Sequence, residues 1–146
     1  MSQTTWNGPL ASGDKAAGIT GGPNIGLATL SQTAVVNFDA TLVQNATFYL
    51  PANSRIVDII VDGLVAYNSA TSATFSAGTS TGDTSYVNGV NVKTTGRKSN
   101  SYSAAQLLAM SNIGTNTTLV ATVTSVGQPT AGQITINVTY VQTTGN

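Results

Sequence analysis

The sequence predicts an all-β fold, a single-domain β-sandwich or jelly roll of about eight strands with one short helix and an extended N-terminal arm. Three observations lead to this prediction. From Ile25 onward, apolar and polar residues alternate with a period of two, which is typical of strands with one buried face. Clusters of Gly, Pro, Asn and Ser separate the alternating runs. Threonine is abundant, and it suits the exposed face of a sheet.

At 146 residues, the chain has room for one domain with a sizeable core. We expect the sandwich domain over residues 25–146 and the arm over residues 1–24, which are rich in Gly, Ser and Thr. The apolar residues of the arm, among them Trp6 and Leu10, follow no period. This segment is either a frayed terminus or an arm that becomes ordered against a neighbouring subunit, with Trp6 as its anchor.

The alternation predicts four strands in the first half of the domain. They are expected at Ala34–Phe38, Thr47–Leu50, Arg55–Val65 and Thr74–Gly78. In the third and most hydrophobic of them, Val57, Ile59 and Val61 share one face, which we expect to be core because it is purely β-branched. The opposite face includes Asp58 and Asp62 and should meet solvent or a partner.

The next segment carries the strongest local hairpin signal in the chain. In Ser85–Val92, the pair Asn88-Gly89 lies between apolar residues, and both residue types tolerate a positive φ. The alternative is a loop that crosses the top of the sheet. Residues Ser103–Met110 then form the expected helix of one or two turns, with Ser103 as its N-cap, and this helix would plug one end of the β-structure.

Two further strands are expected at the C-terminus. Thr117–Val126 and Gln133–Gln142 flank a Gly- and Pro-containing turn at 127–132. The second of them alternates regularly between apolar and polar residues, and the first presents apolar residues to match. We therefore expect a closing hairpin.

The charge content sets limits on the partner. Only 7% of the residues are charged, against about 25% in an ordinary soluble domain, and five basic residues balance five acidic ones. Such a surface favours association, and it argues against nucleic acid, which needs clustered Lys and Arg. The single basic cluster, Lys93, Arg97 and Lys98, lies in a Gly/Ser/Asn-rich loop typical of a solvated turn. No apolar run approaches the 18–20 or so residues that span a bilayer, so we expect no membrane partner.

The residue types also predict that the protein is not an enzyme. The chain has no His and no Cys, so it lacks the commonest general base and the strongest nucleophile. Asp58 and Asp62 would lie roughly 13 Å apart on a strand, beyond the spacing of about 6.5–9.5 Å used by inverting glycosidases. The oxygen-rich loop at 78–84 has one carboxylate, too few for a calcium site. We expect no catalytic residue, metal or cofactor.

Four short motifs give the chain a family resemblance. They are Leu50-Pro51, the strand Ile56–Val61, the step Ala66-Tyr67-Asn68 and the turn Gly78-Thr79-Ser80. With the expected hairpin at Thr117–Gln142, they resemble small tailed-bacteriophage virion proteins of the head decoration or cement type, over about half of the chain. The resemblance implies a protein that binds the major capsid protein lattice and itself, as a dimer or trimer, and so stabilises the head. It implies a place on the outer capsid surface of the virion, with assembly in the bacterial host cytoplasm.

The family has no active-site motif, so the expected contact residues come from the chain itself. We predict partner binding by Trp6 and Leu10 of the arm and by the loop around Arg97 and Lys98. One alternative is a phage tail or fibre component that binds a host-surface glycan through exposed tyrosines, and another is a remote enzyme or secreted adhesin domain.

Overall fold

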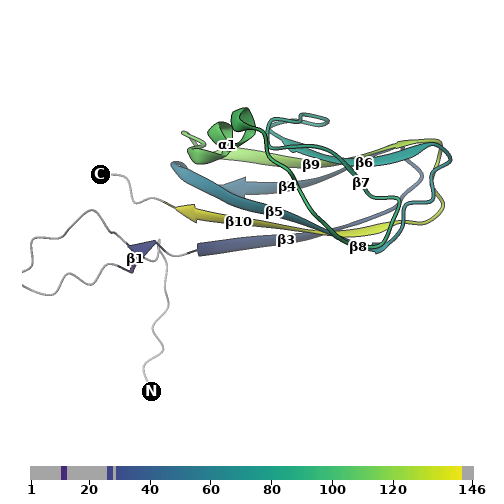
Figure 1. Cartoon of the computed structure of the whole chain (residues 1–146), viewed down its shortest axis with the longest axis horizontal. Coiled ribbons are helices and arrows are strands. Elements are labelled where there is room, and N and C mark those ends of the chain that lie inside the picture. Colours follow the sequence, from purple (N-terminus) through teal and green to yellow (C-terminus); the bar gives the residue numbers. More distant parts are fainter. Residues whose placement is uncertain (1–10, 13–25, 28, 143–146) are drawn as a thin grey trace, which may run out of the picture.

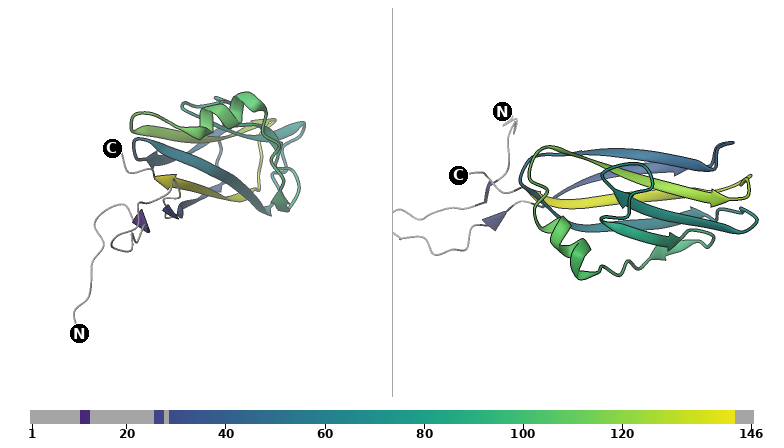
Figure 2. Two further views of the ribbon diagram at one scale, coloured as in Figure 1. Left: turned by 60° about the vertical axis from the view of Figure 1, so that its left-hand side comes forward. Right: turned by 90° about the horizontal axis from the view of Figure 1, so that it is seen from above.

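The computed structural model describes residues 11–12, 26–27 and 29–142. It shows two four-stranded antiparallel sheets packed face to face, with one short helix beside them (Figures 1 and 2). The predicted all-β sandwich is therefore confirmed. A separate two-stranded ladder joins β1 (Ala11–Ser12) to β2 (Gly26–Leu27). The predicted contact residues Trp6 and Leu10 lie outside the described residues.

The strand order is that of a jelly roll. One sheet contains, in order, β3 (Thr29–Asn37), β10 (Gln133–Gln142), β5 (Ser54–Val65) and β8 (Gly96–Lys98). The other contains β4 (Val43–Leu50), β9 (Thr117–Val126), β6 (Ser72–Gly78) and β7 (Val87–Asn91). The chain changes sheets at every connection within the sandwich except that between β6 and β7, as in double-sheet jelly rolls.

The C-terminal strands have the predicted bounds, but they do not pair with each other. β9 and β10 belong to different sheets, and residues 127–132 form an arch between them. Their apolar faces meet in the interior, where Leu119 and Val123 of β9 and Ile134 and Ile136 of β10 are buried. The predicted closing hairpin is wrong because alternation identifies the buried face of a strand and not its hydrogen-bonded neighbour.

A β-bulge changes the predicted faces of β5. On β10, Thr139 pairs with Asp58 and the next residue pairs with Ile56, so Val57 is an extra residue. The bulge turns Ile56 into the core, where it is 2% exposed, and leaves Val57 46% exposed. The predicted core face is confirmed for Ile59 and Val61 and is wrong for Val57.

The pair Asn88-Gly89 forms a bulge within the single edge strand β7, and so both the predicted hairpin and the alternative loop are wrong. Phe75 and Ala77 of β6 pair with residues 90 and 87, which places two residues of β7 opposite one of β6. Gly89 has a φ of 66°. A hairpin turn and a bulge both use a glycine with positive φ, so the local signal fits either.

The predicted helix is confirmed as α1 (Ala104–Ser111), with Ser103 as its N-cap. The Ser103 hydroxyl accepts a hydrogen bond from the Gln106 backbone amide, and the Gln106 side chain accepts one from the Ser103 amide at 2.9 Å. This capping box fixes the start of the helix. The helix packs beside β5 at the end of the sandwich where β10 ends, with Met110 buried (Figure 1).

Candidate interaction surfaces

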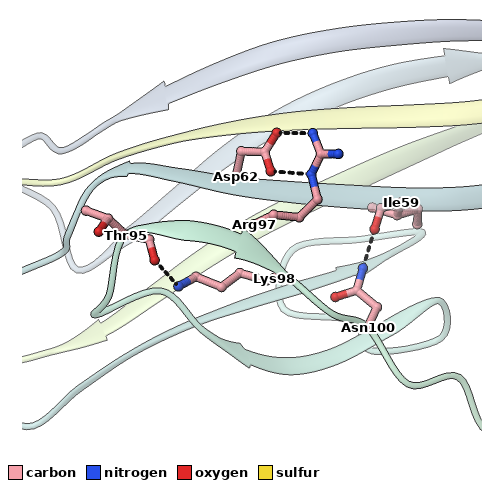
Figure 3. Close-up of polar contacts among 6 residues, drawn as sticks. All are labelled: Ile59, Asp62, Thr95, Arg97, Lys98 and Asn100. Carbon is pink, nitrogen blue, oxygen red and sulfur yellow. Dashed lines mark hydrogen bonds and ion pairs between the residues drawn. The ribbon is translucent and has the colours of Figure 1, made fainter.

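The predicted contact residue Arg97 lies on a short edge strand, β8, and not in a loop. Its guanidinium forms a bidentate ion pair with Asp62 of β5, with Nε to Oδ1 at 2.8 Å and Nη2 to Oδ2 at 2.9 Å (Figure 3). These hydrogen bonds lower the pKa of Asp62 and raise the pKa of Arg97. The Arg97 side chain is nevertheless 69% exposed, so it lies at the surface with its charge already matched.

The other two cations of this cluster bind backbone carbonyls. The ammonium of Lys98 donates to the carbonyl of Thr94 at 2.6 Å. It also donates to the carbonyl of Thr95 at 3.2 Å (Figure 3). The Lys93 ammonium donates to the carbonyl of Thr71 at 3.2 Å. The structure thus brings Arg97 and Lys98 together on β8, and each basic group there has a local partner. This arrangement stabilises the connection between β7 and β8.

Side chains continue the edge of β5 where β8 ends. The Asn100 side-chain amide donates to the carbonyl of Ile59 (Figure 3), and the Ile59 backbone amide donates to the hydroxyl of Tyr102 at 3.1 Å. The same hydroxyl donates to Asp58 at 2.7 Å. Since β8 pairs only with residues 61–63, these side chains satisfy the backbone groups that a longer strand would bind.

Six of the large exposed apolar residues belong to segments at the end of the sandwich opposite α1, where the β3–β4, β5–β6 and β9–β10 connections lie on the right in Figure 1. We call this surface the loop end, and its large exposed apolar residues are Phe38, Leu42, Val43, Leu64, Val65 and Val126. They come from the connection between β3 and β4 and from the ends of β4, β5 and β9. This surface was not predicted from the sequence, because these residues lie at strand ends and in turns, where alternation no longer assigns a face. The available signal was the presence of Phe38 and Leu42 in a short connection.

A buried polar network holds the loop end in place. The hydroxyl of Tyr67, which is fully buried, donates to the Gln44 side-chain carbonyl at 2.7 Å. The Gln44 amide donates to Asp39 at 3.0 Å, and Asp39 also accepts the backbone amide of Thr41 at 2.7 Å. Burial, with a smaller effect of the nearby Asp39 charge, raises the pKa of Tyr67 to about 12. Hydrogen bonds from Thr41 and then Gln44 lower the pKa of Asp39.

Asn68 fixes a second pair of connections at the same end. Its side-chain carbonyl accepts the backbone amides of Thr130 at 2.8 Å and Ala131 at 3.0 Å, and its amide donates to the Thr130 hydroxyl. Nearby, Gly132 lies against the ring of Tyr67, and a Cβ at this position would approach the ring to 2.5 Å. The loop end is therefore pre-organised, which reduces the entropy lost when a partner binds.

The oxygen-rich connection between β6 and β7 is organised around Asp83. This carboxylate accepts hydrogen bonds from the amide and hydroxyl of Thr79 and from the amide and hydroxyl of Ser85. Burial raises the pKa of Asp83, but hydrogen bonds from Ser85 and Thr79 outweigh it and lower the pKa to about 2. Among the described residues, no three carboxylate groups lie together as a cluster that could hold a metal ion. No described helix is long and apolar enough to cross a membrane.

The tyrosines differ in exposure. Tyr67, Tyr86 and Tyr140 are buried, and Tyr102 is half-buried with its hydroxyl hydrogen-bonded. Tyr49 on β4 is 74% exposed. The described surface thus offers one fully accessible tyrosine ring.

Among solved structures, the chain is similar to one described as "Cyanophage Pam1 capsid asymmetric unit", with a TM-score of 0.57 and 16% sequence identity. The match covers 90% of this chain and 99% of that chain. At this identity the similarity shows a shared fold. No protein-family model matches the chain, and no curated protein does.

Proposed function

We propose that the protein is a structural component of a bacteriophage virion, a decoration or cement protein that binds the major capsid protein lattice on the outer surface of the head. The shared fold with a chain of a cyanophage capsid asymmetric unit supports a capsid-associated role, since that similarity extends over nearly the whole length of both chains. The resemblance of the four motifs between residues 50 and 80 to phage decoration proteins supports the more specific role.

The observation that carries the proposal is the pre-organised apolar loop end. Single exposed apolar side chains are ordinary, but a concentration of them on one part of a surface is typical of an interaction site, and six of the large ones belong to the loop end. Each of these side chains is about half exposed, and burying the rest of one contributes roughly 1 kcal/mol. Modest contacts of this size suffice on a capsid lattice. The lattice presents many identical binding sites close together, so a bound protein meets the neighbouring sites at a high effective concentration.

The surroundings of the loop end fit a protein interface. β8 lies at the same end of the sandwich (Figure 1), so Arg97 and Lys98 would contribute a polar rim around the apolar contact. Because Arg97 is already paired with Asp62, salt should weaken the contact little. Trp6 and Leu10 remain predicted additional contacts in the arm.

Binding of the full-length protein to purified phage heads that lack it tests the proposal. We expect Leu42→Asp and Leu64→Asp to weaken binding at least tenfold, because each places a charge in the apolar contact. Leu108→Asp is the matched control: this leucine is 75% exposed on α1, at the opposite end, and its replacement should leave binding unchanged. Thermal unfolding of each variant checks that it folds.

Two outcomes would contradict this account. If moderate salt strips the protein from heads, the contact is not the uncharged one that we describe. If Leu108→Asp abolishes binding while the loop-end variants bind normally, the docked surface lies at the other end of the sandwich.

A tail or fibre protein that binds a host glycan is the alternative. That role needs a platform of exposed aromatic rings, and the described residues supply Tyr49 alone as a fully accessible tyrosine. Binding of the isolated protein to a glycan array would favour it, as would a copy number restricted to one vertex of the particle.

A further inference from the structure

One long edge of the sandwich has unpaired backbone groups. The Phe38 amide donates to the Gly132 carbonyl at 2.8 Å, in line with the register between β3 and β10. Because hydrogen-bonded and non-hydrogen-bonded pairs alternate in an antiparallel ladder, the even-numbered residues of β3 bind β10. The odd-numbered residues, from Thr29 to Asn37, therefore direct their amides and carbonyls away from the sheet. In the described part of the chain, β3 pairs with β10 alone.

The edge strand of the other sheet, β4, follows the same rule. The Ser125 amide donates to the Leu42 carbonyl at 2.7 Å, so the even-numbered residues of β4 face β9 and the odd-numbered ones face outward. The carbonyl of Tyr49 agrees with this orientation, since it accepts the side-chain amide of Gln32 from β3 at 2.8 Å. The two free edges thus lie side by side along one flank of the sandwich (Figure 2).

The opposite flank is protected against strand addition. There β7 contains the Asn88-Gly89 bulge, and the edge of β5 is covered by β8, by Asn100 and Tyr102, and by α1. Bulges, short strands and charges are the usual devices that prevent edge-to-edge pairing. β3 and β4 have none of them: each is eight or nine residues long, with regular pairing and no proline or charged residue.

We propose that β3 pairs with β3 of a second copy of this chain, which joins two sandwiches into a dimer with a continuous eight-stranded sheet. Two identical strands can pair antiparallel about a two-fold axis only if their opposed side chains tolerate each other. Here the register that uses the whole strand is centred on Thr33, so that Thr33 faces its own copy and Ser31 faces Val35. Threonine pairs and small polar–apolar pairs are favourable across strands, and no like charges meet.

The geometry favours a second copy over another occupant. The odd-numbered residues of both strands must face each other, and the Thr33-centred register satisfies this condition for all five outward residues. The same axis brings the two β4 edges toward each other, with Tyr49 beside them. An isologous contact of this kind closes at two subunits. This inference goes beyond the proposed function and does not depend on it.

The mass of the full-length protein in solution tests the inference. We expect a two-chain mass by sedimentation or light scattering, and Thr33→Lys should raise the dissociation constant at least tenfold, because two ammonium groups would face each other at the axis. Asn88→Lys places the same charge on the protected flank and should leave the dimer intact. A monomeric or trimeric wild-type protein, or a dimer indifferent to Thr33→Lys, would overturn the inference.

A cross-linking experiment covers the case in which Thr33→Lys fails to fold. Because the chain has no cysteine, Thr33→Cys introduces a single thiol, and directly opposed strand residues lie within the Cα separation that a disulfide spans. We expect a covalent dimer on mild oxidation of Thr33→Cys and none with Asn88→Cys. Equal cross-linking of both variants would show random collision and refute the pairing. Binding to phage heads is measured separately, so a failed dimer and a failed capsid role are distinguishable.

Discussion

Replacing Tyr67 with phenylalanine tests whether the buried polar network stabilises the loop end. The substitution removes a hydroxyl that donates to Gln44 at 2.7 Å, in a side chain with no exposed surface. A hydrogen bond between uncharged groups contributes about 1 kcal/mol net, and a buried acceptor left unpaired costs about 1–3 kcal/mol. Gln44 is only 6% exposed, so water replaces the lost donor poorly. We expect a loss of about 2 kcal/mol in the free energy of unfolding.

The measurement is urea-induced unfolding, with thermal unfolding as a second readout. A loss of this size lowers the Tm by about 4–8 °C in a domain near this length. Tyr49→Phe is the matched control, because Tyr49 is 74% exposed, and it should change the free energy of unfolding by less than about 0.5 kcal/mol. The double variant Tyr67→Phe/Gln44→Leu should be less destabilised than the sum of its parts, because it removes both partners of the bond.

Equal free energies of unfolding for Tyr67→Phe and Tyr49→Phe would refute a stabilising role for the buried network. Strict additivity in the double variant would also count against it, because the two side chains would then contribute independently. In the proposed role, Tyr67→Phe should bind phage heads more weakly than Tyr49→Phe, because a looser loop end loses more entropy on docking.

Three further predictions concern single side chains. Gly132→Ala should destabilise the fold by about 2 kcal/mol, because its Cβ would meet the Tyr67 ring at 2.5 Å. Gly82→Ala has no atom within 4 Å of its Cβ, so it should cost only about 1 kcal/mol, for its positive φ. Urea unfolding of the two variants measures the difference. The pKa of Asp83 is lowered to about 2 in the folded protein, and it is near 4 in the unfolded chain. The ionised carboxylate therefore adds its full share to the free energy of unfolding above about pH 4, and this share is lost as the pH falls from about 4 to 2. Asp83→Asn should therefore be less stable than wild type by about 1 kcal/mol at pH 7, after discounting for solvent screening, and the difference should shrink over that range in pH-dependent melts. Arg97→Ala should lower the free energy of unfolding only slightly, and 1 M salt should reduce the difference from wild type, because the ion pair is exposed and screened by solvent.

Periodicity in the sequence predicted the strands better than it predicted their neighbours. The bounds of β9 and β10 follow from alternation that runs unbroken to the flanking turn, and Ser103 follows from the chemistry of helix capping. Pairing depends on which faces fit together in three dimensions, which a one-dimensional pattern does not contain. The bulge at Val57 is likewise set by the register of β10 and has no local signal in a run of β-branched residues.

The candidate surfaces were harder to predict. Gly, Ser and Asn around Arg97 indicated a loop, and the structure has a three-residue strand there, held by its partner β5. The loop end includes Phe38 and Leu64, which are distant in sequence and lie at the same end of one sheet only because β10 pairs with both β3 and β5. Trp6 and Leu10 stay predictions, because they lie outside the described residues.

The place of β10 in its sheet has a consequence for biosynthesis. This strand is made last in the sandwich, yet it lies between β3 and β5, and β9 is likewise inserted between β4 and β6. Neither sheet is complete before β9 and β10 are made, since in the described part of the chain β3 pairs only with β10 and β4 only with β9. Folding of the complete sandwich should therefore follow the synthesis of β10 and be slow, as expected when the pairing residues are far apart in sequence. A product that terminates before β9 lacks the partners of both β3 and β4 and cannot complete either sheet.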